Sequence, residues 1–297
     1  MKGRQFLKHG LSVGGALAVG ARAHGAPKSA FGEPARKNAY DVVELGPDKI
    51  KLSRLAMGTG TSGFGGSSDQ TRKLGVPGLV ELYRYGFDNG LTFWDTADQY
   101  GSHPHLAAAL KYIPRDEVAI MTKSRAKTAD QMRSDIERYR KELNSDYIDI
   151  LLLHAVTDGN WPENYRGAMD VVNEYKQKGV VRSRGISCHS LPALKRVADT
   201  DYIDVDLARV NPVGDRMDAD PATVIEELQR IKAAGKGIIG MKILGGGGQL
   251  TQRVDYSLQH ALALNCVDCF TIGAESETQL ADLVQRIPPA ARHGWQS

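Results

Sequence analysis

Cysteine is scarce in this chain of 297 residues, which contains only Cys188, Cys266 and Cys269. Three cysteines cannot build a disulfide framework, so the fold must be stabilised by its core. Cys266 and Cys269 have the C-x-x-C spacing of redox and metal motifs, but no second such pair lies nearby. They also stand at the start of an apolar run typical of a strand, in which positions i and i+3 face opposite sides. We therefore expect core cysteines and no metal site.

A strong net charge is also lacking. The formal charge of +3 arises from residues 1–26, which hold four basic residues and no acidic one. Without them, 34 basic residues face 35 acidic ones, a balance of −1. Nucleic-acid binding needs lysine and arginine clustered on the folded domain. We therefore expect no nucleic-acid partner.

No apolar run is long enough for a stable membrane span, including the one near the N-terminus. There, Lys2, Arg4 and Lys8 precede a short glycine-rich apolar run and the small-residue pattern Ala21-Arg-Ala23. This order predicts a signal peptide over residues 1–26, followed by a linker over 27–39.

The route of export is suggested by Gly3-Arg-Gln-Phe-Leu-Lys8. This stretch resembles the twin-arginine signal, with Gly3 in place of the first arginine. We expect the export machinery as a partner and a periplasmic or exported location. A disordered N-terminal tail on a cytoplasmic protein is the alternative.

Residues 40–290 show an alternating pattern. A hairpin is expected first, from Val42–Leu45 and Ile50–Leu52 around Gly46-Pro-Asp48. Eight short apolar runs follow, which we expect to be strands: 54–58, 91–95, 117–122, 147–153, 181–186, 204–210, 237–242 and 267–272. Segments with apolar residues at three-to-four spacing follow them and are expected helices: 80–89, 106–112, 129–143, 165–178, 191–198, 222–234, 254–264 and 275–286.

Alternation of this kind is typical of either a doubly wound sheet or a closed barrel. Glycines 58, 60 and 63 match G-x-G-x-x-G after the first strand, but Ser67–Lys73 does not resemble the start of a helix that cradles a phosphate. We therefore predict an α/β fold of the (β/α)8 TIM-barrel type with an N-terminal β-hairpin. Residues 58–73 are expected to form a flexible loop over the barrel mouth.

Functional groups of such barrels lie at the carboxyl ends of the strands. Asp95 ends the second predicted strand and Tyr100 follows it, while Lys123 and His154 lie at the ends of the third and fourth. The Lys123 ammonium can lower the pKa of Tyr100, making it a better proton donor, and Asp95 can neutralise and hold the lysine. His154 can orient a carbonyl by a hydrogen bond. Each residue alone has an ordinary structural explanation, but the set of four predicts a catalytic site.

Asp95-Thr-Ala-x-x-Tyr100-Gly101, Lys123, Leu-Leu-Leu-His154 and Gly185-Ile-Ser187 together resemble the aldo-keto reductase family. The resemblance implies an oxidoreductase that uses NAD or NADP on a carbonyl or alcohol, with Tyr100 as general acid, Lys123 and Asp95 tuning it, and His154 placing the substrate. It also implies cofactor contacts, for which the candidates are Gly58, Thr59, Ser187, Asn211, Lys242, Leu244, Gly245, Gly273 and Gln279.

The cofactor contacts depart from the family pattern. Cys188 stands where members have an asparagine, and Leu207 where they have a glutamine. Arg209, Asn211 and the glycines of 242–248 are candidate replacements, the glycines because backbone amides there can approach pyrophosphate. A mobile loop is the alternative interpretation of that stretch.

The cofactor type is suggested by the segment after the last strand. Members that prefer NADP have a lysine and an arginine where this chain has Gly273 and Gln279. Glu275 and Glu277, expected in the first helical turn, would repel a 2′-phosphate. The sequence therefore favours NAD over NADP, unless Lys242, Arg253 or Arg286 reaches the site.

The substrate is expected to be small and polar. The chain stops soon after Arg286, which suggests an open pocket able to admit a sugar. Trp94, Trp161 and His103 could contact it at the mouth, although core positions are equally consistent with their patterns. Two other functions stay open: a redox-neutral epimerase with a retained cofactor, and a non-catalytic carbohydrate-binding barrel.

Overall fold

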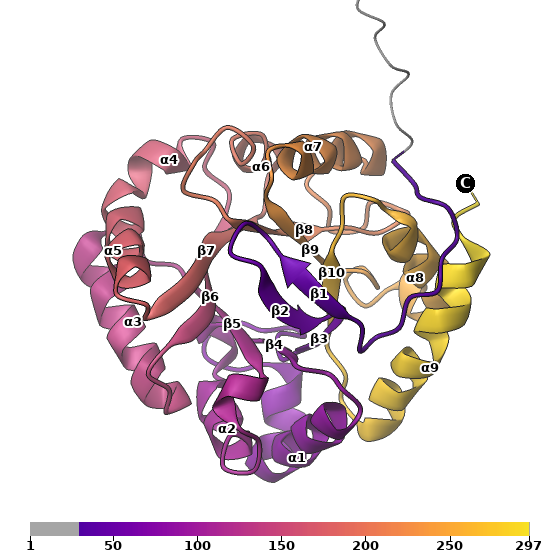
Figure 1. Ribbon diagram of the computed structural model, residues 1–297, viewed down its shortest axis with the longest axis horizontal. Coiled ribbons are helices and arrows are strands. Elements are labelled where there is room, and N and C mark those ends of the chain that lie inside the picture. Colours follow the sequence, from indigo (N-terminus) through magenta and orange to yellow (C-terminus); the bar gives the residue numbers. More distant parts are fainter. Residues whose placement is uncertain (1–29, 297) are drawn as a thin grey trace, which may run out of the picture.

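The computed structural model describes residues 30–296, and in this part of the chain eight parallel strands close into a barrel (Figure 1). The barrel closes in the order β10-β3-β4-β5-β6-β7-β8-β9. The predicted (β/α)8 fold is confirmed. The strands are β3 (Leu55–Gly58), β4 (Phe93–Asp95), β5 (Ala119–Ser124), β6 (Ile148–Val156), β7 (Val181–Cys188), β8 (Val205–Arg209), β9 (Gly237–Met241) and β10 (Cys269–Ile272).

The strands are buried on both faces, as their nearly continuous apolar runs require. In β6 every residue from Ile148 to His154 is buried. The third predicted strand is displaced by two residues, because Arg115–Glu117 forms a 3-10 turn and β5 starts at Ala119. Lys123 therefore lies inside β5 rather than just past it.

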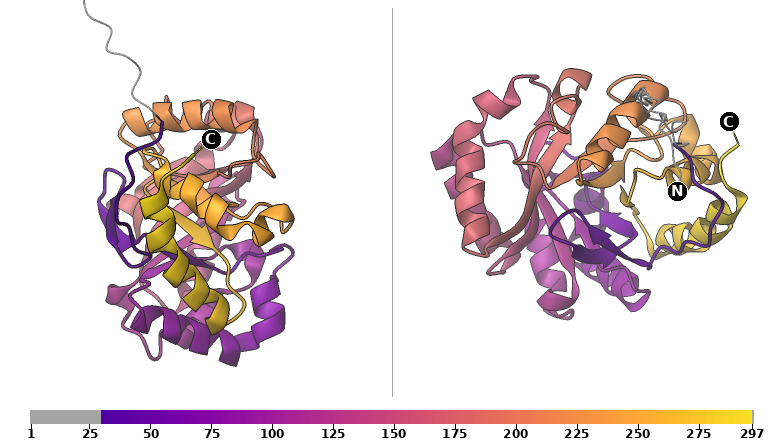
Figure 2. Two further views of the ribbon diagram at one scale, coloured as in Figure 1. Left: turned by 90° about the vertical axis from the view of Figure 1, so that its right-hand side faces the viewer. Right: turned by 45° about the horizontal axis from the view of Figure 1, so that its top comes forward.

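Helices surround the barrel, as the side view in Figure 2 shows. They are α1 (Asp69–Asp88), α2 (His103–Ala109), α3 (Ala129–Leu143), α4 (Trp161–Asn164), α5 (Arg166–Gln177), α6 (Leu191–Leu194), α7 (Pro221–Ala233), α8 (Val254–Ala263) and α9 (Glu277–His293). Two short 3-10 helices complete the C-terminal face, η1 (Asp98–Tyr100) and η3 (Gln249–Gln252).

The start of α1 differs from the expected flexible loop. The helix begins at Asp69, because Ser68 caps it in a reciprocal capping box with Thr71. Gly75 then interrupts it with φ 59° and ψ −169°, and the second half continues to Asp88. The capping hydrogen bonds therefore start the helix here, although residues 67–73 lack the regular apolar spacing of a helix.

The hairpin of β1 (Val42–Leu45) and β2 (Ile50–Ser53) lies across one end of the barrel, in the foreground of Figure 1. Leu45 and Leu52 are buried in the same apolar cluster as Phe93, Ile150 and other barrel-interior residues. The hairpin thus closes the end where the strands begin, and leaves the carboxyl ends of the strands for a functional site.

The described part of the predicted linker packs along α8. Gly32 donates a backbone hydrogen bond to Ala263 (2.8 Å), and the Lys37 ammonium donates to the Leu262 carbonyl (2.6 Å). Phe31 stacks with Trp295, so this segment also contacts the C-terminal end (Figure 1). The predicted signal peptide, residues 1–26, lies outside the described residues.

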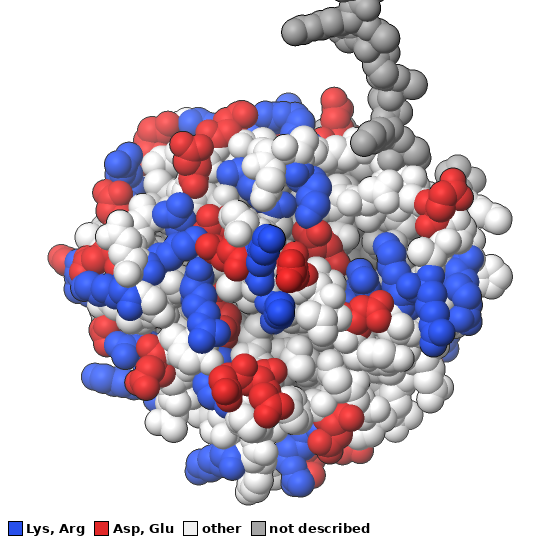
Figure 3. Space-filling view, viewed as in Figure 1, with Lys and Arg blue, Asp and Glu red and all other residues white. Residues whose placement is uncertain are grey.

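Two other sequence expectations concern the core and the surface. Cys188, Cys266 and Cys269 are buried free thiols, and burial raises the pKa of each, so the prediction of core cysteines is confirmed. Basic and acidic side chains are interspersed over most of the face that carries the hairpin (Figure 3). Between residues 30 and 296, no helix combines the length and apolar character needed to cross a membrane.

Candidate active site

Asp95 and Lys123 form a buried ion pair at the carboxyl ends of two neighbouring strands. Asp95 ends β4, and the Lys123 side chain, 1% exposed, donates to its carboxylate from β5. Lys123 also donates to the Thr96 carbonyl (2.7 Å), and Thr271 at the end of β10 donates to the other Asp95 oxygen (2.8 Å). Burial would lower the pKa of Lys123, but Asp95 and Tyr100 raise it above its ordinary value. The lysine is therefore charged and fixed in place.

Tyr100 lies directly above this pair, on η1. The Lys123 ammonium is 4.9 Å from the centre of the Tyr100 ring. A Cβ atom added at Gly60 would lie 2.5 Å from the ring, and one at Gly63 would lie 2.4 Å from it, so two glycines permit the loop after β3 to pack on the tyrosine. Burial raises the pKa of Tyr100 overall, although Lys123 lowers it as predicted. At neutral pH the hydroxyl keeps its proton.

His154 faces the edge of Tyr100 from β6. The two ring centroids are 5.7 Å apart and the ring planes meet at 86°. The strand continues to Val156 through an irregularity after Leu153, where Ala155 has φ 53°. Burial lowers the pKa of His154 well below its ordinary value, and Lys123 and His189 lower it further. The imidazole is therefore neutral and can donate one hydrogen bond.

The structure thus brings together all four residues of the predicted catalytic set. Sequence reasoning missed two neighbours, Thr271 and His189. Thr271 holds Asp95 from the strand that closes the barrel, a contact that only closure creates. The His189 ring lies 6.5 Å from that of His154, centroid to centroid, at the end of the next strand.

Ser187 and Lys242 are the predicted cofactor residues that have free polar atoms. The Ser187 hydroxyl is buried at 1% exposure without a hydrogen-bond partner in the described structure. Lys242 follows β9, is partly buried, and makes no ion pair with any described residue. A buried hydroxyl and a free ammonium fit a carboxamide and a pyrophosphate respectively.

Other predicted cofactor residues already use their polar groups inside the protein. Asn211 donates to the carbonyls of Asp215 (2.7 Å) and Lys242 (3.2 Å) and accepts from two backbone amides, so its side chain stabilises the loop after β8. Arg209, the other candidate replacement from this strand, is paired with Asp218.

The glycine stretch after β9 is also partly engaged. The amide of Gly245 donates to the Lys242 carbonyl (2.8 Å), and that of Gly246 to Asp215 (2.7 Å). Leu244 packs against the core and offers no polar side chain. The glycines at 246, 247 and 248 are exposed, and a Cβ added at 247 or 248 would meet nothing within 4 Å.

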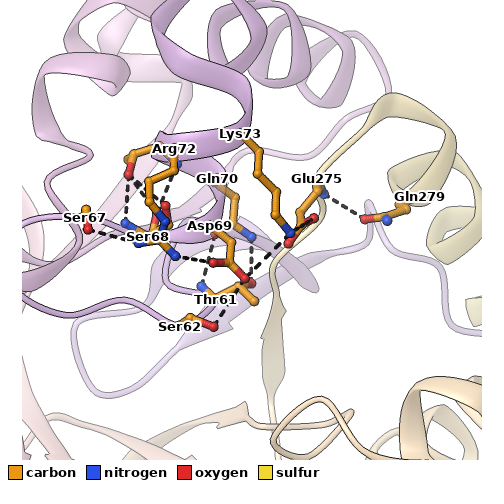
Figure 4. Close-up of polar contacts among 11 residues, drawn as sticks. Thr61, Ser62, Ser67, Ser68, Asp69, Gln70, Arg72, Lys73, Glu275 and Gln279 are labelled. Atoms are coloured by element: carbon orange, nitrogen blue, oxygen red, sulfur yellow. Dashed lines mark hydrogen bonds and ion pairs between the residues drawn. The ribbon is translucent and has the colours of Figure 1, made fainter.

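Next to this stretch around the mouth, the loop after β3 packs against the loop after β10 (Figure 4). A Cβ atom at Gly273 would lie 2.5 Å from the Thr61 hydroxyl and 2.6 Å from the Gln70 amide, while one at Gly58 would crowd Thr271. Thr59 is buried and donates to the Asp95 carbonyl (2.9 Å). These contacts explain the small residues at 58 and 273 by packing.

The sequence analysis missed one cation beside this loop, Lys73. Lys73 donates to the Glu275 carboxylate (2.7 Å), and the Gln279 side chain accepts from the Glu275 amide (2.8 Å; Figure 4). Glu275 precedes the cap of α9, Ser276, so its expected place in the first turn was wrong. Arg286 instead pairs with Asp255 and Asp282, and Arg253 stacks on Tyr256.

The three candidate sugar contacts belong to the core. Trp94 and Trp161 are completely buried, and Trp94 meets Tyr83 edge to face. His103 is 2% exposed and bonds to Glu142 and Thr122, at 2.7 Å each. The sequence left open whether these three residues line the mouth or belong to the core, and the structure places them in the core.

An open cavity of about 540 Å³ lies between η1 and α3, and none of the four catalytic residues lines it. It shares η1 with Tyr100, and one wall is Arg125, two residues after Lys123. Its lining is polar and includes Asp98, Gln131 and Ser134. Asp98 is neutralised by Arg138 at 2.7 Å.

Comparison with known proteins agrees with this geometry. The model of the aldo/keto reductase family matches residues 56–279, and the chain belongs to that family. Among curated relatives, a probable aldo-keto reductase of Glycine max is 30% identical over 52% of this chain and 46% of its own length. L-galactose dehydrogenase of Arabidopsis thaliana is 26% identical over 70% of this chain and 66% of its own. The alignments with the first curated relatives thus span about half to two thirds of their lengths.

Solved structures share the fold at lower identity. A putative aldo-keto reductase from Pseudomonas aeruginosa superposes with a TM-score of 0.71, 21% identity and coverage of 85% of this chain and 96% of its own. The holo form of an aldo-keto reductase from Bacillus halodurans gives a TM-score of 0.67 at 18% identity, covering 86% and 94%.

Proposed function

We propose that this protein transfers hydride between a nicotinamide cofactor and the carbonyl or alcohol group of a small polar substrate. The observation that carries the proposal is the convergence of Asp95, Tyr100, Lys123 and His154 at neighbouring strand ends. A bound nicotinamide supplies or accepts the hydride. An intact set of this kind supports catalysis over a carbohydrate-binding barrel without activity.

In the reductive direction, the protein residues handle the substrate oxygen. The neutral His154 donates a hydrogen bond that orients the carbonyl. The Tyr100 hydroxyl then gives its proton to the oxygen as negative charge develops there. Lys123 stabilises the resulting phenolate, and Asp95 keeps the lysine in position.

Ser187 and Lys242 are the residues we propose to hold the cofactor, because their polar atoms are free in a buried or partly buried setting. We propose that NAD binds at least as tightly as NADP, since Gly273 carries no cation and Lys73 is engaged by Glu275. A sugar-like substrate is supported by two distant relatives, L-galactose dehydrogenase of Arabidopsis thaliana and D-arabinose 1-dehydrogenase of Saccharomyces cerevisiae.

The direct test uses the full chain purified from its native host. Mass spectrometry should detect co-purified NAD or NADP, and absorbance at 340 nm should report NADH or NADPH consumption with a panel of aldehydes and sugars. Failure to oxidise or reduce any member of the panel with either cofactor would contradict the proposal. Conversion of a sugar without net cofactor consumption would favour the epimerase alternative instead.

We also propose that the protein is exported, on the basis of the signal-like pattern in residues 1–26. N-terminal sequencing of native protein should find a start between about Ala23 and Lys28. Finding Met1 or Lys2 on most molecules would place the protein in the cytoplasm.

A further inference from the structure

His189 occupies the next position around the barrel mouth after His154. It directly follows β7, and its backbone amide donates to the Val156 carbonyl of β6 (2.8 Å). Its ring lies 6.5 Å from that of His154 at an angle of 83°, and the His154 ring lies 5.7 Å from that of Tyr100. Tyr100, His154 and His189 therefore form a row along one side of the mouth.

No role inside the protein accounts for the His189 ring. Within residues 30–296, no group forms a hydrogen bond with it, although the side chain is half-buried. Half-buried polar groups without protein partners are usually satisfied by water or by a ligand. The adjoining His154 shows the same pattern, because its Nδ1 atom is buried and without a partner in the described residues.

The charges around His189 keep its ring neutral. Burial lowers the pKa of His189 to about 4, and Arg209, Lys242, Lys123 and Arg125 act in the same direction. Two of these cations are paired with carboxylates, Lys123 with Asp95 and Arg209 with Asp218. A neutral imidazole has one donor and one acceptor, which is the hydrogen-bonding pattern that a hydroxyl group matches.

We infer that His189 is a specificity-determining residue that binds a hydroxyl group on the carbon next to the reacting carbonyl. The inference rests on the proposed function, which places the carbonyl oxygen between Tyr100 and His154. The next carbon of the substrate then reaches the His189 ring, since the three rings follow one another around the mouth. The substrate class is that of hydroxylated carbonyl compounds, including open-chain sugars.

A substrate with an apolar group on the carbon next to the carbonyl would displace water from His189 without replacing the hydrogen bonds of that water. Leaving a buried polar group unpaired is the costly case, so the site should discriminate strongly against substrates that lack the hydroxyl. The preference for a hydroxyl group can be measured separately from the chemistry at Tyr100.

The experiment compares glyceraldehyde with propionaldehyde, which has the same carbon chain without hydroxyls. The His189→Phe variant should lose about tenfold or more in kcat/KM for glyceraldehyde, mainly through KM, and change less than about twofold for propionaldehyde. His189→Asn keeps a donor and an acceptor and should recover part of the loss. His260→Phe is a matched control, because burial likewise lowers the pKa of His260 to about 4. His260 lies on α8, where its ring packs against Phe31 and Trp295.

Equal losses on both aldehydes, or no loss on glyceraldehyde, would overturn the inference. Binding of the unreactive polyol erythritol, followed by saturation-transfer NMR, gives a second readout that needs no turnover. Erythritol should bind the wild type and bind His189→Phe at least several-fold more weakly. If the wild type reduces neither aldehyde, the proposed function fails, and the erythritol comparison still decides the role of His189.

Discussion

The rings of Tyr100 and His154 meet edge to face, with centroids 5.7 Å apart and planes at 86°. The Lys123 ammonium lies 4.9 Å from the centre of the same tyrosine ring. The two side chains come from different strand ends, and both are neutral because burial raises the pKa of Tyr100 and lowers that of His154. Two neutral donors over a fixed ammonium suit a carbonyl oxygen that gains charge and then a proton.

Removing the Tyr100 hydroxyl should abolish most of the activity. We expect Tyr100→Phe to lower kcat/KM for carbonyl reduction by about 10² to 10⁴, because only the proton donor is lost. Cofactor affinity, followed by quenching of protein fluorescence, should change less than about threefold. A variant that kept more than about a tenth of the activity would exclude Tyr100 as the acid.

Gly60 should be sensitive to a single methyl group. A Cβ atom at position 60 would lie 2.5 Å from the Tyr100 ring, so Gly60→Ala should lower the free energy of unfolding by about 1–3 kcal/mol. In a Tyr100→Ala background the ring is absent, and the same substitution should cost less than about 1 kcal/mol. Urea denaturation of the four proteins measures this coupling. Additive effects would show that the loop does not pack on the tyrosine in solution.

The Lys73–Glu275 ion pair should influence the choice of dinucleotide. We expect Glu275→Gln to release Lys73 and remove a negative charge, which should strengthen NADP(H) binding at least several-fold relative to NAD(H). Lys73→Met in the same chain should reverse the gain. Titration of both cofactors by calorimetry checks the prediction, with Arg84→Met as a control cation on the same helix. An unchanged ratio would show that the 2′-position lies elsewhere.

Asp206 should make the protein less stable as the pH rises. The side chain is completely buried, neither carboxylate oxygen has a partner among the described residues, and burial raises its pKa to about 8. A carboxyl whose pKa is higher in the folded state than in the unfolded one stabilises the folded protein fully at pH values below its unfolded pKa, near 3.9. This contribution is lost as the pH rises through the folded pKa of about 8.

Asp206→Asn removes this titration. The variant should therefore gain stability relative to the wild type between pH 6 and pH 9, by more than about 1 kcal/mol. Chemical denaturation at the two pH values measures the difference. Parallel pH profiles for the two proteins would mean that Asp206 finds a partner in solution.

The sequence by itself determined the barrel and the catalytic set. Alternating apolar runs and helical patterns specify the eight-stranded fold, because parallel strands must be buried on both faces. The positions of Asp95, Tyr100, Lys123 and His154 near strand ends then place them in one mouth. These features depend on local patterns that a linear sequence displays.

Only the tertiary structure decided which polar groups remain free. Asn211 and Thr59 were plausible cofactor ligands in the sequence, but folding uses their side chains in loop and strand contacts. Lys73 reaches Glu275 across 202 positions, and Thr271 reaches Asp95 across 176, because the barrel closes β10 onto β3. For Trp94 and His103 the sequence left the mouth and the core equally open, and packing buries both. Such pairings depend on closure and side-chain packing between distant segments, which no local pattern records.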